Sequence, residues 1–204
     1  MKIHNFIFDN SGTLNDNFKN VYLASMFVFK RLGIKMLSLE GFRNKFKIPY
    51  IDFYREYTDV SKKQIDEWLL MAINHLPKPQ LFFGVRDTLE FLRIKRKRMA
   101  ILSFESQESL EKQIQDNDLK SYFLDVLGGI HDKAEALNSL IDYNYFLLNK
   151  TVYVGDTVYD IEAAKQIGIK AVAIAWGLHS KRRLRKAKPD FLINDILEIK
   201  KIIA

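Results

Sequence analysis

The chain has 204 residues, of which 48% are hydrophobic and 28% charged, a balance typical of soluble globular proteins. It contains no cysteine, which excludes disulfide bonds, thiolate metal sites and cysteine nucleophiles. The net charge is +7, and no stretch approaches the roughly 20 apolar residues that a membrane-spanning helix needs. The opening apolar run is too short for a signal peptide, so we expect a cytoplasmic protein without a membrane partner.

The first predicted element is a strand over residues 3–8, an apolar run rich in β-formers that ends in Asp-Asn-Ser-Gly. The pattern then becomes helical from residue 15 to residue 79. Apolar residues over 18–32 recur at helical spacing, and Gly33 is placed to end that helix. A Ser61–Gln64 capping box is predicted to begin a later helix that Pro77 stops. This block contains no convincing strand.

Strands and helices alternate after Pro79, which implies a parallel sheet with helices on both faces. The sequence therefore predicts an α/β fold with a Rossmann-like core, formed by residues 1–14 and 80–204, and a small all-helical cap, residues 15–79, inserted after the first strand. Predicted strands cover residues 99–104, 126–127, 151–154, 170–175 and 191–193, and predicted helices cover 85–92, 107–114, 134–141, 160–167 and 195–203.

Two basic segments, residues 93–98 and 181–188, raise the question of nucleic-acid binding. Neither segment has interleaved aromatic residues on which bases could stack. We therefore interpret them as a solvated helix end and a solvated loop, and we do not expect nucleic acid as a partner. Their positive potential would still attract anionic substrates.

Polar residues follow the predicted strands at the sheet edge where parallel sheets place their active sites. Asp9 is a carboxylate followed by a glycine turn whose backbone N–H groups, at Gly12 and Thr13, could bind an anion. The Ser103 hydroxyl leaves the second strand, and Lys133 opens a helix. Asp156 and Asp160 lie beside Gly155 and offer an oxygen-rich site suited to Mg²⁺.

Each of these residues also has a purely structural interpretation. Asp9 could cap a turn, Ser103 could be an ordinary strand-end hydroxyl, Lys133 could lie on the surface, and Asp160 could be the N-cap of its helix. Four such residues in this order, each at a strand end, are harder to explain by chance than any one of them.

The sequence resembles the haloacid dehalogenase-like superfamily over nearly its whole length. Residues 8–14, Phe-Asp-Asn-Ser-Gly-Thr-Leu, resemble the first motif of that family, Asp-x-Asp-Gly-Thr-Leu. Ser103 matches the second motif, Lys133 the third, and the segment from Gly155 to Asp160 the fourth. The segments Phe-Gly-Val at 83–85, Ala-Trp-Gly at 175–177 and Lys-Pro-Asp-Phe at 188–191 sit where phosphoglycolate-phosphatase-like members carry similar ones.

The resemblance implies a phosphohydrolase that acts on a small phosphorylated metabolite. Asp9 would attack phosphorus and form an aspartyl-phosphate, which water then hydrolyses. Mg²⁺ would be held by Asp9, the Ser11 backbone carbonyl and Asp156, with Asp160 as a ligand or an outer partner. Ser103 and Lys133 would hold the transferring oxygens. Arg43, in the cap, could clamp a distal phosphate or carboxylate, or it could be a surface residue of a cap helix.

The chain departs from the family pattern at Ser11, where family phosphatases carry an aspartate that exchanges protons with the leaving group and the water. A serine cannot do this near neutral pH, so a general acid–base contribution of about 10²–10⁴-fold would be missing. The enzyme could be slow, or it could act on acyl or aryl phosphates, whose leaving groups need no proton. A substrate or cap group such as Arg43, Lys45 or Lys47 could supply the proton. Alternatively, the protein binds a phosphorylated ligand or a partner without turnover. Dehalogenation is a weaker alternative because it leaves the acidic pair without a role.

Overall fold

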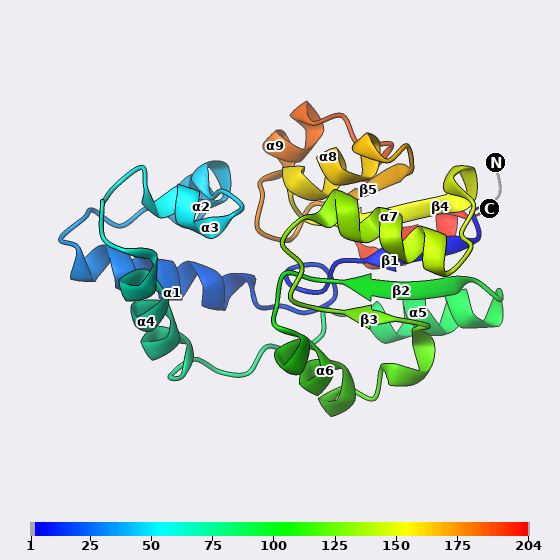
Figure 1. Cartoon of the computed structure of the whole chain (residues 1–204), viewed down its shortest axis with the longest axis horizontal. Coiled ribbons are helices and arrows are strands. Elements are labelled where there is room, and N and C mark those ends of the chain that lie inside the picture. Colours follow the sequence, from blue (N-terminus) through cyan, green and yellow to red (C-terminus); the bar gives the residue numbers. More distant parts are fainter. Residues whose placement is uncertain (1–2, 204) are drawn as a thin grey trace.

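The computed structural model describes residues 3–203, and its core is a six-stranded sheet in which every pair of neighbouring strands is parallel. The strand order is β3-β2-β1-β4-β5-β6, which is the Rossmann order (Figure 1). The strands are β1 Asn5–Phe8, β2 Arg98–Leu102, β3 Val126–Leu127, β4 Thr151–Gly155, β5 Lys170–Ile174 and β6 Phe191–Ile193. The predicted α/β fold and the position of each predicted strand are confirmed.

Helices cover both faces of the sheet because successive residues of each strand point to opposite sides. On β1, Phe6 and Phe8 pack with one hydrophobic cluster, whereas Ile7 packs with the other. The first cluster is covered by α5 Val85–Ile94, α6 Gln107–Asp116 and α10 Ile199–Ile202. The second is covered by α7 Lys133–Tyr143, α8 Val158–Gln166 and α9 Lys181–Lys186. Short 3-10 turns lie at Lys120–Tyr122, Leu148–Lys150 and Ile196–Glu198.

Four helices leave the sheet after β1 and return before α5, and they lie together at one end of the molecule (Figure 1). They are α1 Phe18–Arg31, α2 Leu39–Lys45, α3 Tyr50–Tyr54 and α4 Lys62–Ile73. Their shared core is aromatic: the ring of Phe29 stacks on Phe53 at 5.6 Å, and Phe42 meets Phe53 edge-on at 5.5 Å. We call these four helices the cap. The placement of the domain boundaries at residues 14–15 and 79–80 stays a prediction.

Three local expectations differ from the structure. Residues 181–188 were expected to form a loop, but α9 begins there because the Ser180 side chain accepts a hydrogen bond from Arg183 N and Leu184 is buried. The capping box of α4 is only half formed, since the Gln64 side chain contacts Glu67. The last predicted helix is split into a 3-10 turn and the short α10. None of the helices within residues 3–203 is long and apolar enough to cross a membrane.

Candidate active site

Two carboxylates mark the centre of the sheet edge. Asp9 follows β1 and Asp156 follows β4, and these two strands are neighbours in the middle of the sheet. The chain runs outward from β1 through β2 to β3 and then returns beside β1 as β4, so the strand order reverses between them. Ligands of open α/β sheets bind at such a switch point. Both side chains are buried, with Asp9 4% and Asp156 1% exposed.

Lys133 connects Asp9 to Asp160 inside the protein. Its Nζ lies 2.6 Å from Asp9 Oδ1 and 2.6 Å from Asp160 Oδ1. The second oxygen of Asp160 accepts hydrogen bonds from Thr157 N at 2.9 Å and Thr157 Oγ1 at 2.6 Å. Thr157 is the N-cap of α8, so the expectation that Asp160 is the N-cap was wrong; Asp160 is the third residue of the helix and completes a capping box. We call Asp9, Lys133, Thr157 and Asp160 the lysine cluster.

The opposite charges within the lysine cluster offset the cost of burying them. Burial raises the pKa of Asp9 to about 7, and the nearby Lys133 ammonium opposes that rise. Burial alone would lower the pKa of Lys133, but the carboxylates of Asp160 and Asp9 hold it well above its usual value. Burial by itself would raise the pKa of Asp160. The contacts with Lys133 and Thr157 outweigh this effect and hold the pKa of Asp160 below its usual value. Because both Asp160 oxygens have protein partners, this residue is placed to hold Lys133.

Asp156 is confined on two sides by glycine. A Cβ atom at Gly12 would lie 2.3 Å from Asp156 Oδ2, and one at Gly177 would lie 2.2 Å from the same oxygen. That oxygen accepts a hydrogen bond from Leu178 N at 2.6 Å. Burial raises the pKa of Asp156 well above its usual value, and the carboxylates of Asp9 and Asp160 raise it further.

These features fit a hard divalent cation, which would offset the mutual repulsion of buried carboxylates. Asp9 and Asp156 both face the cavity described below, and Ser11 is the third residue expected to contribute an oxygen, through its backbone carbonyl. Within residues 3–203, no group of three or more histidine or acidic side chains is arranged to hold a metal ion. Asp160, predicted as a ligand or an outer partner, has its Oδ1 bound by Lys133.

A second polar group lies beside Asp9 and is built from amides around one carboxylate. Glu105, in the loop after β2, accepts hydrogen bonds at Oε2 from Asn10 Nδ2 at 2.9 Å and Gln113 Nε2 at 3.1 Å. Its other oxygen, Oε1, lies 3.3 Å from Asn17 Nδ2, which also contacts the Ser11 hydroxyl. We call Asn10, Asn17, Glu105 and Gln113 the amide cluster. This cluster was not predicted from the sequence, because polar residues from separate loops and from α6 share no periodic pattern.

The glycine turn after Asp9 is held by its own hydrogen bonds. Gly12 N donates to Asn15 O at 2.9 Å, and Thr13 N donates to Asn10 O at 3.1 Å. The N–H groups that we expected to bind an anion are therefore used within the turn. The Thr13 hydroxyl instead lies 3.3 Å from Asp9 Oδ2. Ser103 Oγ accepts from Glu105 N at 3.2 Å, which leaves the Ser103 hydroxyl proton available to a ligand.

A cavity of about 460 Å³ lies between these residues and the cap. Five predicted site residues line it, namely Asp9, Ser11, Ser103, Lys133 and Asp156. Glu105 and His131 also line it from the core. Its cap wall is largely apolar or aromatic and includes Val21, Phe46, Pro49, Tyr50, Tyr54 and Leu69, with Lys62 as its charged residue. The structure thus brings most of the predicted residues to one chamber of a size suited to a small ligand.

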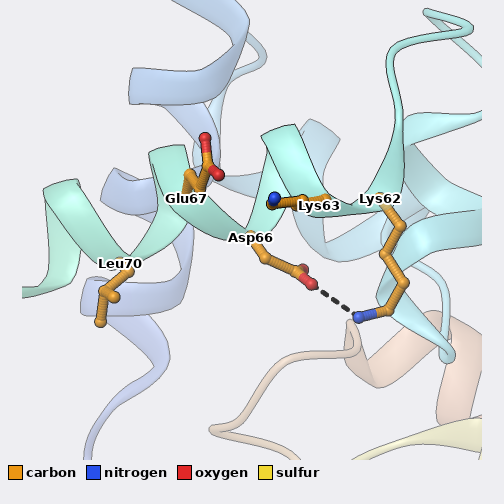
Figure 2. Close-up of a pocket in the computed structure, with 5 residues that line it drawn as sticks. All are labelled: Lys62, Lys63, Asp66, Glu67 and Leu70. Carbon is orange, nitrogen blue, oxygen red and sulfur yellow. Dashed lines mark hydrogen bonds and ion pairs between the residues drawn. The ribbon is translucent and has the colours of Figure 1, made fainter.

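Lys62 connects this chamber to the outer surface of α4. Figure 2 shows a shallow hollow there, lined by charged side chains and Leu70. In this hollow the Lys62 Nζ lies 2.6 Å from Asp66 Oδ2 (Figure 2). The hydroxyl of Tyr50, a residue that lines the chamber, also binds Asp66. Lys62 and Asp66 are partly exposed, so their ion pair is worth little. We regard the hollow as solvated surface.

Arg43 lies apart from the chamber. Its Nη2 donates to the backbone oxygens of Ala175 at 2.8 Å and His179 at 3.1 Å, so its guanidinium fastens the cap to the loop after β5. The two cap lysines considered as proton donors are also engaged elsewhere. Lys47 pairs with Glu56, and Lys45 lies over the ring of Tyr57.

Comparisons with known proteins identify the family and the fold. A family model described as haloacid dehalogenase-like hydrolase matches residues 6–174. A phosphoglycolate phosphatase from Synechococcus elongatus is 38% identical over 128 residues, which span 60% of this chain and 60% of that relative. A phosphoglycolate phosphatase from Aquifex aeolicus is 26% identical over 97% of this chain and 95% of its own length. A solved haloacid dehalogenase-like hydrolase from Streptococcus pneumoniae superimposes with a TM-score of 0.83 at 22% identity, covering 99% of both chains.

Proposed function

The chain belongs to the haloacid dehalogenase-like hydrolase family, and from this premise we propose that it is a magnesium-dependent phosphohydrolase that uses Asp9 as its nucleophile. The observation that carries the proposal is the environment of Asp9: a buried carboxylate at the end of β1, bound by Lys133 and lining a chamber with Ser103 and Asp156. Phosphoryl transfer needs mainly positioning and charge stabilisation, and these residues supply both.

Each residue would have a distinct role in the reaction. Lys133 binds Asp9 Oδ1, so it favours the ionised nucleophile and leaves Oδ2 to attack phosphorus. The Lys133 ammonium and the Ser103 hydroxyl would hold the oxygens of the transferring group. Mg²⁺, held by Asp9, Asp156 and the Ser11 carbonyl, would neutralise charge on the phosphate. Water would then hydrolyse the aspartyl-phosphate at Asp9.

The proposed substrate is a small phosphorylated metabolite. A chamber of about 460 Å³ suits such a molecule, and the cap presents mainly apolar and aromatic surface to it. The two relatives described above are named for phosphoglycolate, which is a small phosphorylated metabolite. Arg43 would act on the substrate only indirectly, by fastening the cap over the chamber.

The test combines chemistry at Asp9 with removal of the metal. The wild-type chain should hydrolyse 4-nitrophenyl phosphate with Mg²⁺, lose that activity in EDTA and regain it when Mg²⁺ returns. Asp9→Asn should be inactive while keeping the fold by circular dichroism. Beryllium fluoride with Mg²⁺ should form an adduct on Asp9 that is visible by ¹⁹F NMR. Absence of both the turnover and the adduct would refute the proposal.

The second candidate is a protein that binds a phosphorylated ligand without turnover. It is favoured by Ser11, whose hydroxyl contacts Asn17 and cannot exchange protons usefully near neutral pH. In the same experiment this candidate predicts the beryllofluoride adduct with no turnover. An adduct together with turnover would exclude it.

A further inference from the structure

The surroundings of Ser11 contain a carboxyl group that could do what serine cannot. The amide nitrogen of Asn17 contacts Ser11 Oγ and also lies 3.3 Å from Glu105 Oε1, so a single amide group spans the two side chains. Glu105 and Ser11 line the same chamber, together with Asp9. We propose that Glu105 is the general acid and general base of this enzyme, in an inference that rests on the proposed phosphohydrolase function.

The two oxygens of Glu105 have different surroundings. Oε2 is held by two amides, from Asn10 and Gln113. Oε1 has one longer contact, with Asn17, on the side of Ser11. The backbone of Glu105 is also fixed, because its N–H donates to Ser103 Oγ at 3.2 Å. The carboxyl group is therefore anchored through Oε2, while Oε1 lies on the side of Ser11, which also lines the chamber.

Glu105 is also suited to carry a proton. Burial raises its pKa, and the hydrogen bonds from Asn10 and Gln113 only partly oppose that rise. Within residues 3–203 it makes no ion pair, in contrast to Asp9 and Asp160. The ionisable groups that share its chamber are Asp9, Asp156, Lys133 and His131 from the core, and Lys62, Tyr50 and Tyr54 from the cap. Lys133 is the one that lowers its pKa electrostatically.

The proton movements balance over one cycle. As the Asp9 oxygen bonds to phosphorus and the bond to the leaving oxygen breaks, the proton on Glu105 Oε1 passes to that leaving oxygen. The leaving alcohol departs and Glu105 is ionised. A water then bonds to phosphorus while the Asp9–phosphorus bond breaks, and Glu105 takes the proton that the water releases. Inorganic phosphate leaves, one water is consumed, and Glu105 is protonated again.

A structural role predicts a different behaviour. The amide cluster joins the loop after β1 to α6, and a residue that only braced this junction would affect all substrates alike when it was changed. A general acid matters most when the leaving group is a poor one. Glycerol 2-phosphate, an alkyl ester, needs a proton on its leaving oxygen, whereas 4-nitrophenyl phosphate does not. The ratio of kcat/KM for the two substrates therefore separates the roles.

The experiment compares wild type with Glu105→Gln and with Glu108→Gln, a control at an exposed glutamate near the start of α6. We expect Glu105→Gln to lower kcat/KM on glycerol 2-phosphate by about 10²-fold or more, with a change below about fivefold on 4-nitrophenyl phosphate. The fall of wild-type alkyl activity toward high pH, where Glu105 loses its proton, should be missing in Glu105→Gln. Adding Ser11→Asp to Glu105→Gln should restore alkyl activity by about tenfold or more.

Each outcome decides a distinct point. Equal losses on the two substrates, or an unchanged pH profile, would overturn the role of Glu105 while leaving the phosphohydrolase in place. Activity of Glu105→Gln equal to that of wild type would do the same. A wild type that turns over neither substrate would overturn the proposed function, and this inference with it. Glu108→Gln should match wild type in every measurement.

Discussion

The lysine cluster contains Asp9 and the amide cluster lies beside it, and the two clusters accommodate buried carboxylates in different ways. In the lysine cluster, one ammonium lies 2.6 Å from each of two carboxylates, so charge is balanced by charge. In the amide cluster, one carboxylate is surrounded by neutral amides. Ion pairing holds the pKa of Asp160 low, whereas burial among amides leaves the pKa of Glu105 raised. The first arrangement fixes the charges of Lys133 and Asp160 in place, and the second leaves a proton free to move.

This difference explains how one chamber could serve both parts of phosphoryl transfer. The nucleophile and the oxygens of the phosphate need fixed charge, which Lys133 supplies. The leaving group and the water need a group that gains and loses a proton, which a salt-bridged carboxylate does poorly. The two clusters come from different elements: α7 and α8 carry most of the first, while the loops after β1 and β2 with α6 carry the second. They can therefore be changed separately.

Removing the ammonium should produce the largest effect. In Lys133→Met, Asp9 and Asp160 would stay buried without their cation, and we expect the free energy of unfolding to fall by about 3–5 kcal/mol with loss of activity. Urea denaturation at pH 8 measures the change. The loss should be smaller near pH 6, because Asp9 can then take up a proton. Lys112→Met, which removes an exposed pair with Asp116, is the control and should change stability by about 1 kcal/mol or less. A similar loss in both variants would contradict the comparison.

The next largest effect is expected at Gly177, which confines Asp156. A Cβ there would lie 2.2 Å from Asp156 Oδ2, so Gly177→Ala should displace the carboxylate that we propose as a metal ligand. We expect Mg²⁺ affinity, measured by calorimetry on the folded protein, to fall by about 10–100-fold. Gly168→Ala serves as a control for replacing a glycine, because a Cβ at Gly168 would meet nothing within 4 Å, although its φ of +79° adds local strain. Unchanged affinity in Gly177→Ala would argue against Asp156 as a ligand.

The site residues that follow the strands are more accessible to sequence reasoning than the amide cluster, and the reason is topological. Asp9, Ser103 and Asp156 each follow a buried strand, and a parallel sheet gathers such positions at one edge. Glu105 lies in the loop after β2, and its partners come from positions 10, 17 and 113. Only the folded loops bring them together. A strand pattern can locate strand ends, but it carries no information on loop contacts.

The cap shows a second limit of sequence reasoning. Its helical character follows from hydrophobic periodicity, as the spacing over 18–32 and the observed α1 show. The direction of the Arg43 side chain cannot be predicted from this periodicity, because it depends on how the cap packs against the loop after β5. The same holds for α9, a basic segment that becomes helical through the Ser180 cap and the burial of Leu184. The direction of Arg43 and the burial of Leu184 are consequences of tertiary packing.

The free energy of unfolding should also depend on pH through His179, whose ring contacts the start of α8 beside the lysine cluster. The His179 Nδ1 accepts from Val158 N, at the start of α8, and the other ring nitrogen lies 3.0 Å from Phe46 O in the cap. Burial, together with the nearby Arg183 guanidinium, lowers the pKa of His179 to about 3. The unfolded chain would bind a proton near pH 6.5 while the folded one would not. His179 therefore costs no stability above about pH 6.5 and reduces it by up to ~1.4 kcal/mol per pH unit below that value.

Urea unfolding between pH 7.5 and pH 5 measures this effect. The pH dependence of wild type should exceed that of His179→Gln, in which no imidazole has to stay neutral. His75→Gln changes an exposed histidine and should retain the wild-type dependence. Parallel curves for wild type and His179→Gln would mean that the folded His179 binds its proton normally.

Among these variants, we expect the smallest change in the free energy of unfolding in Glu105→Gln and the largest in Lys133→Met. In Glu105→Gln, a new amide nitrogen would face Asn17, whose Oδ1 is buried without a hydrogen-bond partner. Rotation of the Asn17 amide would turn that oxygen toward both the introduced amide and the Ser11 hydroxyl, and each could donate to it. We therefore expect the free energy of unfolding to change by less than about 1 kcal/mol, within the range of one neutral hydrogen bond. Urea denaturation of Glu105→Gln beside Lys133→Met measures the contrast. A loss of about 3 kcal/mol or more would mean that the Glu105 charge holds the fold as Lys133 does, and that the two clusters do not differ in the way described.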